Sequence, residues 1–292
     1  MITLSGKEFA ATIREDVTER AAKLAADGTP PRLAVVTATD DEASAWYVRS
    51  IAKAAAKVGI TCDVVDLGST ATGPDVAEAL TALSVDGAVH GVILQTPLPA
   101  GLSVADLAGT IAVRKDVDGS NPTSLGRLAA GLPAFAPATA AAVVALLDHH
   151  EVPLDGKHVV VVGRSVVVGK PVAHLLLDRN ATVTVCHSRT ADLAAVTTTA
   201  DVVVAAVGKP GLIKAEHVAE GAVVVDVGTN ATADGGLVGD VDPAVAEKAG
   251  SLTPVPGGVG PVTTALLLRH TVEAAETVQA VPGRRRQPSW RR

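Results

Sequence analysis

Short valine-rich runs recur through the second half of the chain, and they limit its fold more than any other feature. The four runs are HVVVVG (158–163), ATVTVCH (181–187), DVVVAAVG (201–208) and AVVVDVG (222–228). Each is followed by a turn or a helix. Continuous apolar runs of this length are typical of parallel strands that are covered by helices on both faces of a sheet. The runs therefore predict a doubly wound α/β domain.

A second α/β unit is predicted upstream. Strands are expected at 32–38, 61–67 and 91–99, and helices at 7–27, 42–58 and 74–84. In such an open parallel sheet, ligands gather at the carboxyl ends of the strands, where Asp40, Asp41 and Gln95 stand. Two further helices are expected, a bridging one at 138–150 and an amphipathic one at 262–279.

These patterns predict an α/β protein of two lobes. The first lobe is an open parallel domain over 1–137, completed by a C-terminal helix at 262–280. The second is a Rossmann-like domain over 138–261. The last residues, 281–292, contain GRRRQPSWRR from position 283. A basic, proline-containing end of this kind is expected to be a solvated, disordered tail.

Composition narrows the class of protein. The formal net charge of −6 excludes a protein that coats nucleic acid. Two cysteines without a CxxC pair offer neither a disulfide framework nor a metal site, and they fit a reducing compartment. The first residues carry charges throughout and resemble no secretory signal, and no apolar run is long enough to span a membrane. A cytoplasmic protein without a membrane partner is expected.

A turn at 163–169 is the first candidate site. Gly163, Ser165 and Gly169 form a G-x-S-x-x-x-G pattern between a predicted strand and a predicted helix. Glycine permits the tight turn, and the N-terminus of the helix offers N–H groups to a phosphate. This is not the usual dinucleotide fingerprint, and an ordinary strand–helix turn explains these residues equally well.

The end of the next strand favours a nucleotide with a 2′-phosphate. NAD enzymes usually have an acidic residue there, but this chain has Ser188 and Arg189. Together with Arg164, these residues make a cationic pocket that favours NADP over NAD. The alternative for Arg189 is a solvated loop charge. Glycine-bearing loops at 207–213 and 226–230 follow the next two strands and are expected beside the nicotinamide half.

A further loop, TPVPGGVGPVTTALL (253–267), is rigid and allows a ligand to approach its backbone closely. With LQTPLPAGL (94–102), KDVDG (115–119), GRSVVVGKP (163–171) and AVGKPG (206–211), it resembles the bifunctional methylenetetrahydrofolate dehydrogenase/cyclohydrolase family of one-carbon metabolism. The resemblance runs from about residue 5 to about residue 275. It implies a homodimer whose two lobes have a cleft between them. In that cleft the protein would oxidise 5,10-methylenetetrahydrofolate with NADP and hydrolyse the methenyl product to 10-formyltetrahydrofolate.

The resemblance also implies roles for particular residues. Tyr47, Gln95 and Asp118 match the family's catalytic and substrate-binding positions, with Asp118 accepting hydrogen bonds from the pterin. Residues that match the folate wall are Gly257, Gly258 and Pro261. Residues that match the NADP site are Gly163, Arg164, Ser165, Ser188 and Thr229. A turn residue is the ordinary alternative for a lone aspartate in a loop.

The chain departs from the family at one catalytic position. The family pattern is Y-V-x-x-K, but here Ile51 stands four residues after Tyr47, on the same helix face. Arg49 and Lys53 do not replace the lysine, since they point about 200° and about 240° away from Tyr47 around the helix. PATAAA (137–142), TATDDEAS (37–44) and Thr96 also differ from family motifs, which favours a diverged paralogue.

The expected consequence is selective. Hydride transfer needs mainly two correctly placed rings, whereas hydrolysis needs proton transfer by a positioned group. The absence of the lysine should therefore lower the rate of hydrolysis more than the rate of oxidation.

Two alternative functions remain open on sequence alone. One is a paralogue that binds folate or NADP without turnover, and the other is a Rossmann dehydrogenase of another small acid.

Overall fold

The structure is a computed structural model that describes residues 1–232 and 235–279. The predicted tail at 281–292 and the last residue of the helix predicted over 262–280 lie outside these residues. The chain divides into two compact units. We call them the six-stranded unit (Met1–Ala11, Leu128–Leu132 and Ala136–Thr263) and the three-stranded unit (Thr12–Arg127, Pro133–Phe135 and the chain from Thr264 on).

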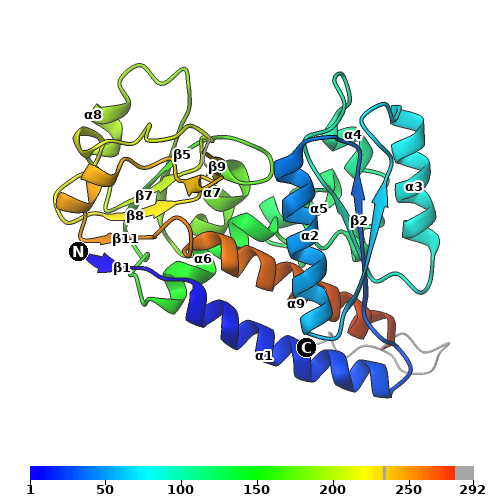
Figure 1. The fold of residues 1–292 in the computed structure, drawn as a ribbon. Helices are drawn as coiled ribbons and strands as arrows, with labels where there is room; N and C mark the ends of the chain where they lie inside the picture. The colour runs from blue at the N-terminus through cyan, green and yellow to red at the C-terminus, as the bar shows by residue number, and fades with distance from the viewer. Residues whose placement is uncertain (233–234, 280–292) are drawn as a thin grey trace. The chain divides into compact units, whose positions relative to one another are not determined.

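The three-stranded unit has a parallel sheet in the order β3-β2-β4. Its elements are α1 (Lys7–Ala26, which begins in the other unit), β2 (Arg32–Thr37), α2 (Glu42–Lys57), β3 (Thr61–Asp66), α3 (Gly73–Val85), β4 (Gly91–Leu94), α4 (Val104–Ala108) and α5 (Pro122–Ala129). Figure 1 shows α2 and α3 on either side of β2. Alternate strand residues, including Ala34, Val36, Val92 and Leu94, form a core with α3.

Local sequence explains where these helices begin and end. Asp41 caps α2 by accepting a hydrogen bond from the Ser44 backbone N–H at 2.7 Å. Thr72 and Asp75 form a reciprocal capping box at the start of α3. Gly59 follows α2 with φ +78°, a conformation that favours glycine, so the predicted end of this helix is confirmed.

The six-stranded unit has a parallel sheet in the order β1-β11-β8-β7-β5-β6. Its strands are β1 (Ile2–Thr3), β5 (His158–Val162), β6 (Thr182–Cys186), β7 (Val202–Ala205), β8 (Val223–Asp226) and β11 (Ser251–Leu252). Its helices are α6 (Ala138–His149), α7 (Gly169–Leu177), α8 (Leu193–Thr197) and the start of α9 (Val259–Gln279). A small antiparallel pair, β9 (Asn230–Ala231) and β10 (Leu237–Val238), completes it.

The four valine-rich runs form adjacent strands of this sheet, as the sequence predicts. Val160, Val162, Val203 and Val224 lie in one buried cluster.

The N-terminus differs from the expected organisation. β1 pairs with β11, so Met1–Ala11 belongs to the six-stranded unit and not to the unit that the following strands build. Two residues of β1 carry too little pattern for a strand prediction, and only the pairing reveals them.

Candidate active site

Tyr47 lies on α2 and is half-buried. Burial raises the pKa of its phenol well above its usual value, and the negative charge of Asp118 raises it further, while a hydrogen bond with Thr264 acts in the opposite direction. The phenol is therefore neutral over the physiological pH range. The structure brings together Tyr47, Asp118 and Thr264, of which Thr264 carries no signal in the sequence.

The KDVDG loop is built around its first two residues. Lys115 is buried, and its ammonium group donates to the carbonyl oxygens of Leu83 at 3.0 Å and Asp86 at 2.5 Å. Burial, helped by the neighbouring charge of Arg114, lowers the pKa of Lys115. These contacts fix the loop, so the lysine is a structural group and not a reactive one.

Asp116 is fully buried and holds the other side of the loop. Its carboxylate accepts hydrogen bonds from the backbone N–H groups of Ser120 at 3.0 Å and Asn121 at 2.9 Å. Burial raises its pKa although these bonds oppose the shift. A bridge between Val92 and Asp116 runs parallel to β4, which places the half-buried Asp118 near the carboxyl end of that strand.

Gln95 stands at the same edge, directly after β4. Its backbone N–H donates to Val36 at 2.8 Å, and its side-chain amide donates to the carbonyl of Thr96 at 2.7 Å. Asp40 and Asp41, which the sequence also placed at this edge, have structural partners. Asp41 caps α2, and Asp40 accepts a hydrogen bond from the Ser69 hydroxyl.

Ile51 lies on the buried stripe of α2. Its side chain is 0% exposed, and the other buried residues of the helix are Ser44, Val48 and Ala55. Arg49 and Lys53 are exposed. The position four residues after Tyr47 is therefore closed to water in this chain, which no sequence pattern revealed.

His270 on α9 supports the loop that carries Asp118. Its Nδ1 lies 2.8 Å from the carbonyl oxygen of Val117, and its ring lies 4.9 Å from the ring of Phe135. Burial lowers its pKa to about 4, so the ring is neutral at physiological pH and donates its Nδ1 proton to that carbonyl. No motif in the sequence marks this residue.

The predicted nucleotide turn begins at Gly163, which has φ +130°. A Cβ atom at Gly163 would lie 2.1 Å from the carbonyl oxygen of Ala206, and one at Gly169 would lie 2.1 Å from that of Gly163. Both positions therefore require glycine. Ser165 is exposed, and its hydroxyl accepts hydrogen bonds from the N–H groups of Val168 at 3.1 Å and Gly169 at 3.4 Å, which hold the turn before α7.

The ends of β5 and β6 lie side by side. The two strands are parallel neighbours, and the Gly163 N–H donates to the Cys186 carbonyl at 2.9 Å. This pairing brings Arg164 to the same edge as Ser188 and Arg189, and all three are exposed. The cationic edge that the sequence predicts thus has free surface for an anionic group.

Thr229 lies at the same edge but follows β8. In the order β8-β7-β5-β6, three strand spacings of about 4.8 Å separate it from the end of β6, or about 14 Å. An extended dinucleotide is long enough to reach both Thr229, after β8, and the end of β6. Thr229 is exposed, and its hydroxyl donates to the Val227 carbonyl at 3.4 Å.

The PVPGGVGP loop packs against the N-terminal segment of the same unit. Gly6 donates to the Gly257 carbonyl at 2.9 Å, and a Cβ atom at Gly6 would lie 2.1 Å from the Gly258 carbonyl oxygen. Gly257 has φ +111°. Gly258 is buried too, and Pro261 is half-buried in the first turn of α9. Gly258 therefore lies against backbone of the same unit, whereas a Cβ atom at Gly257 would meet the Lys7 side chain.

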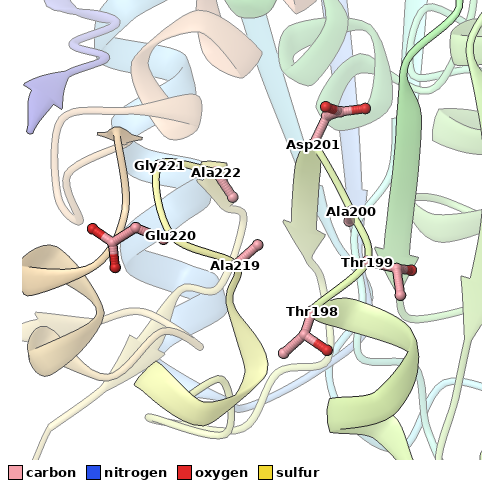
Figure 2. Close-up of a pocket in the computed structure, with 8 residues that line it drawn as sticks. All are labelled: Thr198, Thr199, Ala200, Asp201, Ala219, Glu220, Gly221 and Ala222. Carbon is pink, nitrogen blue, oxygen red and sulfur yellow. The ribbon is translucent and has the colours of Figure 1, made fainter.

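A surface cavity of about 250 Å³ lies elsewhere in the six-stranded unit. It is lined by residues that precede β7 (198–201) and β8 (219–222). Figure 2 shows that the carboxylates of Asp201 and Glu220 point away from each other. Because ligands of parallel sheets bind at the carboxyl ends of strands and this cavity is at the amino ends, it is not the candidate site.

Within residues 1–232 and 235–279, no group of three or more His, Cys, Asp or Glu side chains is arranged to hold a metal ion. The same part of the chain has no helix that is both long and apolar enough to cross a membrane. Both cysteines, Cys62 and Cys186, are free thiols.

Known proteins resemble the whole described chain. The family profile "Tetrahydrofolate dehydrogenase/cyclohydrolase, catalytic domain" matches residues 4–118, and the profile of the NAD(P)-binding domain of that family matches residues 137–279. Bifunctional protein FolD 1 of Saccharopolyspora erythraea is 68% identical over 94% of each chain.

Two solved structures are similar to this chain in fold as well as in sequence. The bifunctional FolD enzyme of Campylobacter jejuni has 41% identity and a TM-score of 0.91, over 95% of this chain and 99% of that chain. The FolD enzyme of Trypanosoma brucei, complexed with NADP cofactor and inhibitor, has 37% identity and a TM-score of 0.90, over 95% of this chain and 98% of that chain.

Proposed function

We propose that this chain, which belongs to the tetrahydrofolate dehydrogenase/cyclohydrolase family, oxidises 5,10-methylenetetrahydrofolate to the 5,10-methenyl compound with NADP. The observation that carries the proposal is the match of both family domains, in order, to one chain. The relatives that share most of its length are named bifunctional FolD proteins, so the family activity comprises oxidation and hydrolysis.

The geometry of the six-stranded unit fits an NADP molecule. Gly163 and Gly169 let the backbone of the turn before α7 pack tightly against itself and against Ala206, and the exposed Arg164 and Arg189 offer positive charge at the ends of two adjacent strands. NADP supplies the acceptor for the hydride when it is bound. We assign to its site Gly163, Arg164, Ser165, Ser188, Arg189 and Thr229.

On the folate side, we assign roles to Tyr47, Gln95 and Asp118. Asp118 accepts hydrogen bonds from the amino and ring N–H groups of the pterin, and its loop is held rigid by the buried Lys115 and Asp116. The neutral phenol of Tyr47 stacks on or near the folate ring and donates a hydrogen bond. Gly257, Gly258 and Pro261 shape the wall of the folate site.

We propose further that hydrolysis of the methenyl compound is the slower activity. The family places a lysine four residues after the tyrosine, where this chain has the fully buried Ile51. Isoleucine neither accepts nor donates a proton, and positioned acid/base groups contribute about 10²- to 10⁴-fold to rate. Oxidation depends mainly on the placement of two rings and is less affected.

We also propose that the protein is a cytoplasmic homodimer. The family resemblance supports the homodimer, and the free thiols support the compartment. Light scattering on a size-exclusion column tests the first proposal, and a mass of one chain contradicts it. Fractionation of cells that make the native chain tests the second.

The central experiment is a coupled pair of assays on the purified protein. Formation of NADPH with methylenetetrahydrofolate measures oxidation, and loss of the methenyl chromophore measures hydrolysis. Turnover with NADP supports the proposal. Binding of both ligands without turnover supports the non-catalytic paralogue, and the absence of folate binding supports a dehydrogenase of another small acid.

A further inference from the structure

Asp240 is fully buried, yet its carboxylate is surrounded by hydrogen-bond donors. Oδ2 accepts from the backbone N–H groups of Val207 at 2.6 Å and Gly208 at 2.9 Å. Oδ1 accepts from the backbone N–H of Lys209 at 2.8 Å and the side-chain amide of Asn230 at 3.0 Å. One side chain thus holds the loop that follows β7 and reaches Asn230 at the start of β9.

A second carboxylate holds Asp240 in place. Asp226, the last residue of β8, accepts hydrogen bonds from the backbone N–H groups of Gly228 and Asp240, both at 2.9 Å, and of Val241 at 3.0 Å. A Cβ atom at Gly239 would lie 1.8 Å from the Asp226 carboxylate. Asp226 and Asp240, with Gly228 and Gly239 packed beside them, therefore fix the positions of the loops that follow β7 and β8.

The supported loop begins against the nucleotide turn. Ala206, which precedes Val207, has its carbonyl oxygen where a Cβ atom on Gly163 would stand. β7 is also the direct neighbour of β5 on the side away from β6. Residues 207–209 therefore lie at the carboxyl edge of the sheet, on the opposite side of Gly163 from Ser188 and Arg189.

We propose that Asp240 is a positioning residue that sets the backbone of residues 207–209 for the nicotinamide half of NADP. The inference rests on the proposed function, because it takes the edge beyond β5 as the site of a dinucleotide. It predicts that loss of the carboxylate weakens contacts to one half of the cofactor and leaves the other half bound as before. A general defect in folding would weaken both halves alike.

Asp240→Asn is the sharpest test because it keeps the shape of the side chain. Each carboxylate oxygen accepts two hydrogen bonds, so the NH₂ group of asparagine faces two N–H donors whichever way the amide turns. The loop must then move to relieve the clash of donors. Asp242→Asn is the matched control, because Asp242 only caps a short helix through the Ala244 N–H at 2.9 Å, and asparagine caps equally well.

The probes are NADPH and adenosine 2′,5′-bisphosphate, which lacks the nicotinamide half. Binding is measured by titration calorimetry on the full chain, with circular dichroism as a check of folding. Asp240→Asn is expected to weaken NADPH binding about tenfold or more, equivalent to about 1.4 kcal/mol. It should change binding of the bisphosphate less than about twofold, and Asp242→Asn should change neither.

Equal weakening of both probes, or no weakening of NADPH, would overturn the role of Asp240. If Asp240→Asn does not fold, Asn230→Ala gives the same test in milder form, because it removes one of the four donors. It should weaken NADPH binding more than bisphosphate binding. A native protein that binds neither probe contradicts the proposed function itself, and that outcome is distinct from failure of the inference.

Discussion

Replacing Ile51 with lysine tests whether the proposed low rate of hydrolysis depends on one side chain. Ile51 is 0% exposed and stands one helical turn after Tyr47. Ile51→Lys restores the Y-V-x-x-K pattern of the family on an intact helix. We expect the rate of methenyl hydrolysis to rise while the rate of oxidation changes little.

The same substitution has a stability cost that burial makes predictable. Removing a fully buried isoleucine side chain loses about 1.5–3 kcal/mol, part of which the lysine stem recovers. Burial lowers a lysine pKa by up to about 3–5 units, and each unit is about 1.4 kcal/mol. A shift of about three units puts the amine near pH 7 and costs about 4 kcal/mol. Since domains are stable by about 5–15 kcal/mol, the variant should fold with reduced stability.

An amine with a pKa near neutrality is also suited to proton transfer. The gain in hydrolysis should approach but not reach the range of about 10²- to 10⁴-fold, because the surrounding residues are packed around isoleucine. The pH profile of hydrolysis should gain a new ionisation near pH 7. Both quantities are measured from the decay of the methenyl chromophore, and stability is measured by urea unfolding.

Ile51→Met is the control, because methionine has a similar volume and no proton to transfer. It should change stability by less than about 1.5 kcal/mol and leave hydrolysis as it is. Two results would refute the reasoning. One is a native hydrolysis rate that equals or exceeds the oxidation rate. The other is a folded Ile51→Lys variant whose hydrolysis does not increase, which would make position 51 a core residue and no more.

Three further predictions concern other parts of the site. The kcat/KM with NADP should exceed the kcat/KM with NAD. Arg164→Ala or Arg189→Ala should lower the kcat/KM for NADP alone, by the equivalent of about 1.5–3 kcal/mol for a charge-assisted contact. Equal use of both cofactors would contradict the assignment. Asp118→Asn should abolish or severely weaken folate use and leave NADP binding nearly intact, so normal turnover would mean that Asp118 is only a loop residue. Burial lowers the pKa of His270 from 6.5 to about 4. As pH falls from 6.5 to about 4, His270 is therefore protonated in the unfolded chain but stays neutral in the folded chain. Stability should therefore decrease by up to about 3 kcal/mol over that window, and His270→Gln should show a flatter pH dependence in urea unfolding; an unchanged slope would contradict the shift.

The periodic elements of this protein are readable from its sequence because burial on both faces leaves a strong local signal. The four valine-rich runs predicted β5, β6, β7 and β8, and their continuous apolar character, with a turn or helix after each, predicted a parallel sheet. The end of α2 was equally predictable, since only glycine adopts the conformation of Gly59 without strain. Gly163 and the missing acid after β6 were local signals for a nucleotide site.

What the sequence did not contain was the set of contacts between distant segments. The pairing of β1 with β11 joins residues about as far apart as the chain allows, and two-residue strands have no periodicity. Lys115 and Asp116 lie within a recognised motif, but only the tertiary structure shows that both are buried supports for Asp118.

The structural roles of Asp226, Asp240 and His270 could not be predicted from the sequence, for the same physical reason. A charged or polar residue in a loop usually faces water, and nothing in its neighbours along the chain distinguishes one that is buried. Asp240 is stabilised in the interior because four N–H donors, three from the loop after β7 and one from Asn230 in β9, converge on it. That convergence is created by folding, so the sequence determined the strands and their turns, and the tertiary structure alone decided which acids hold those turns in place.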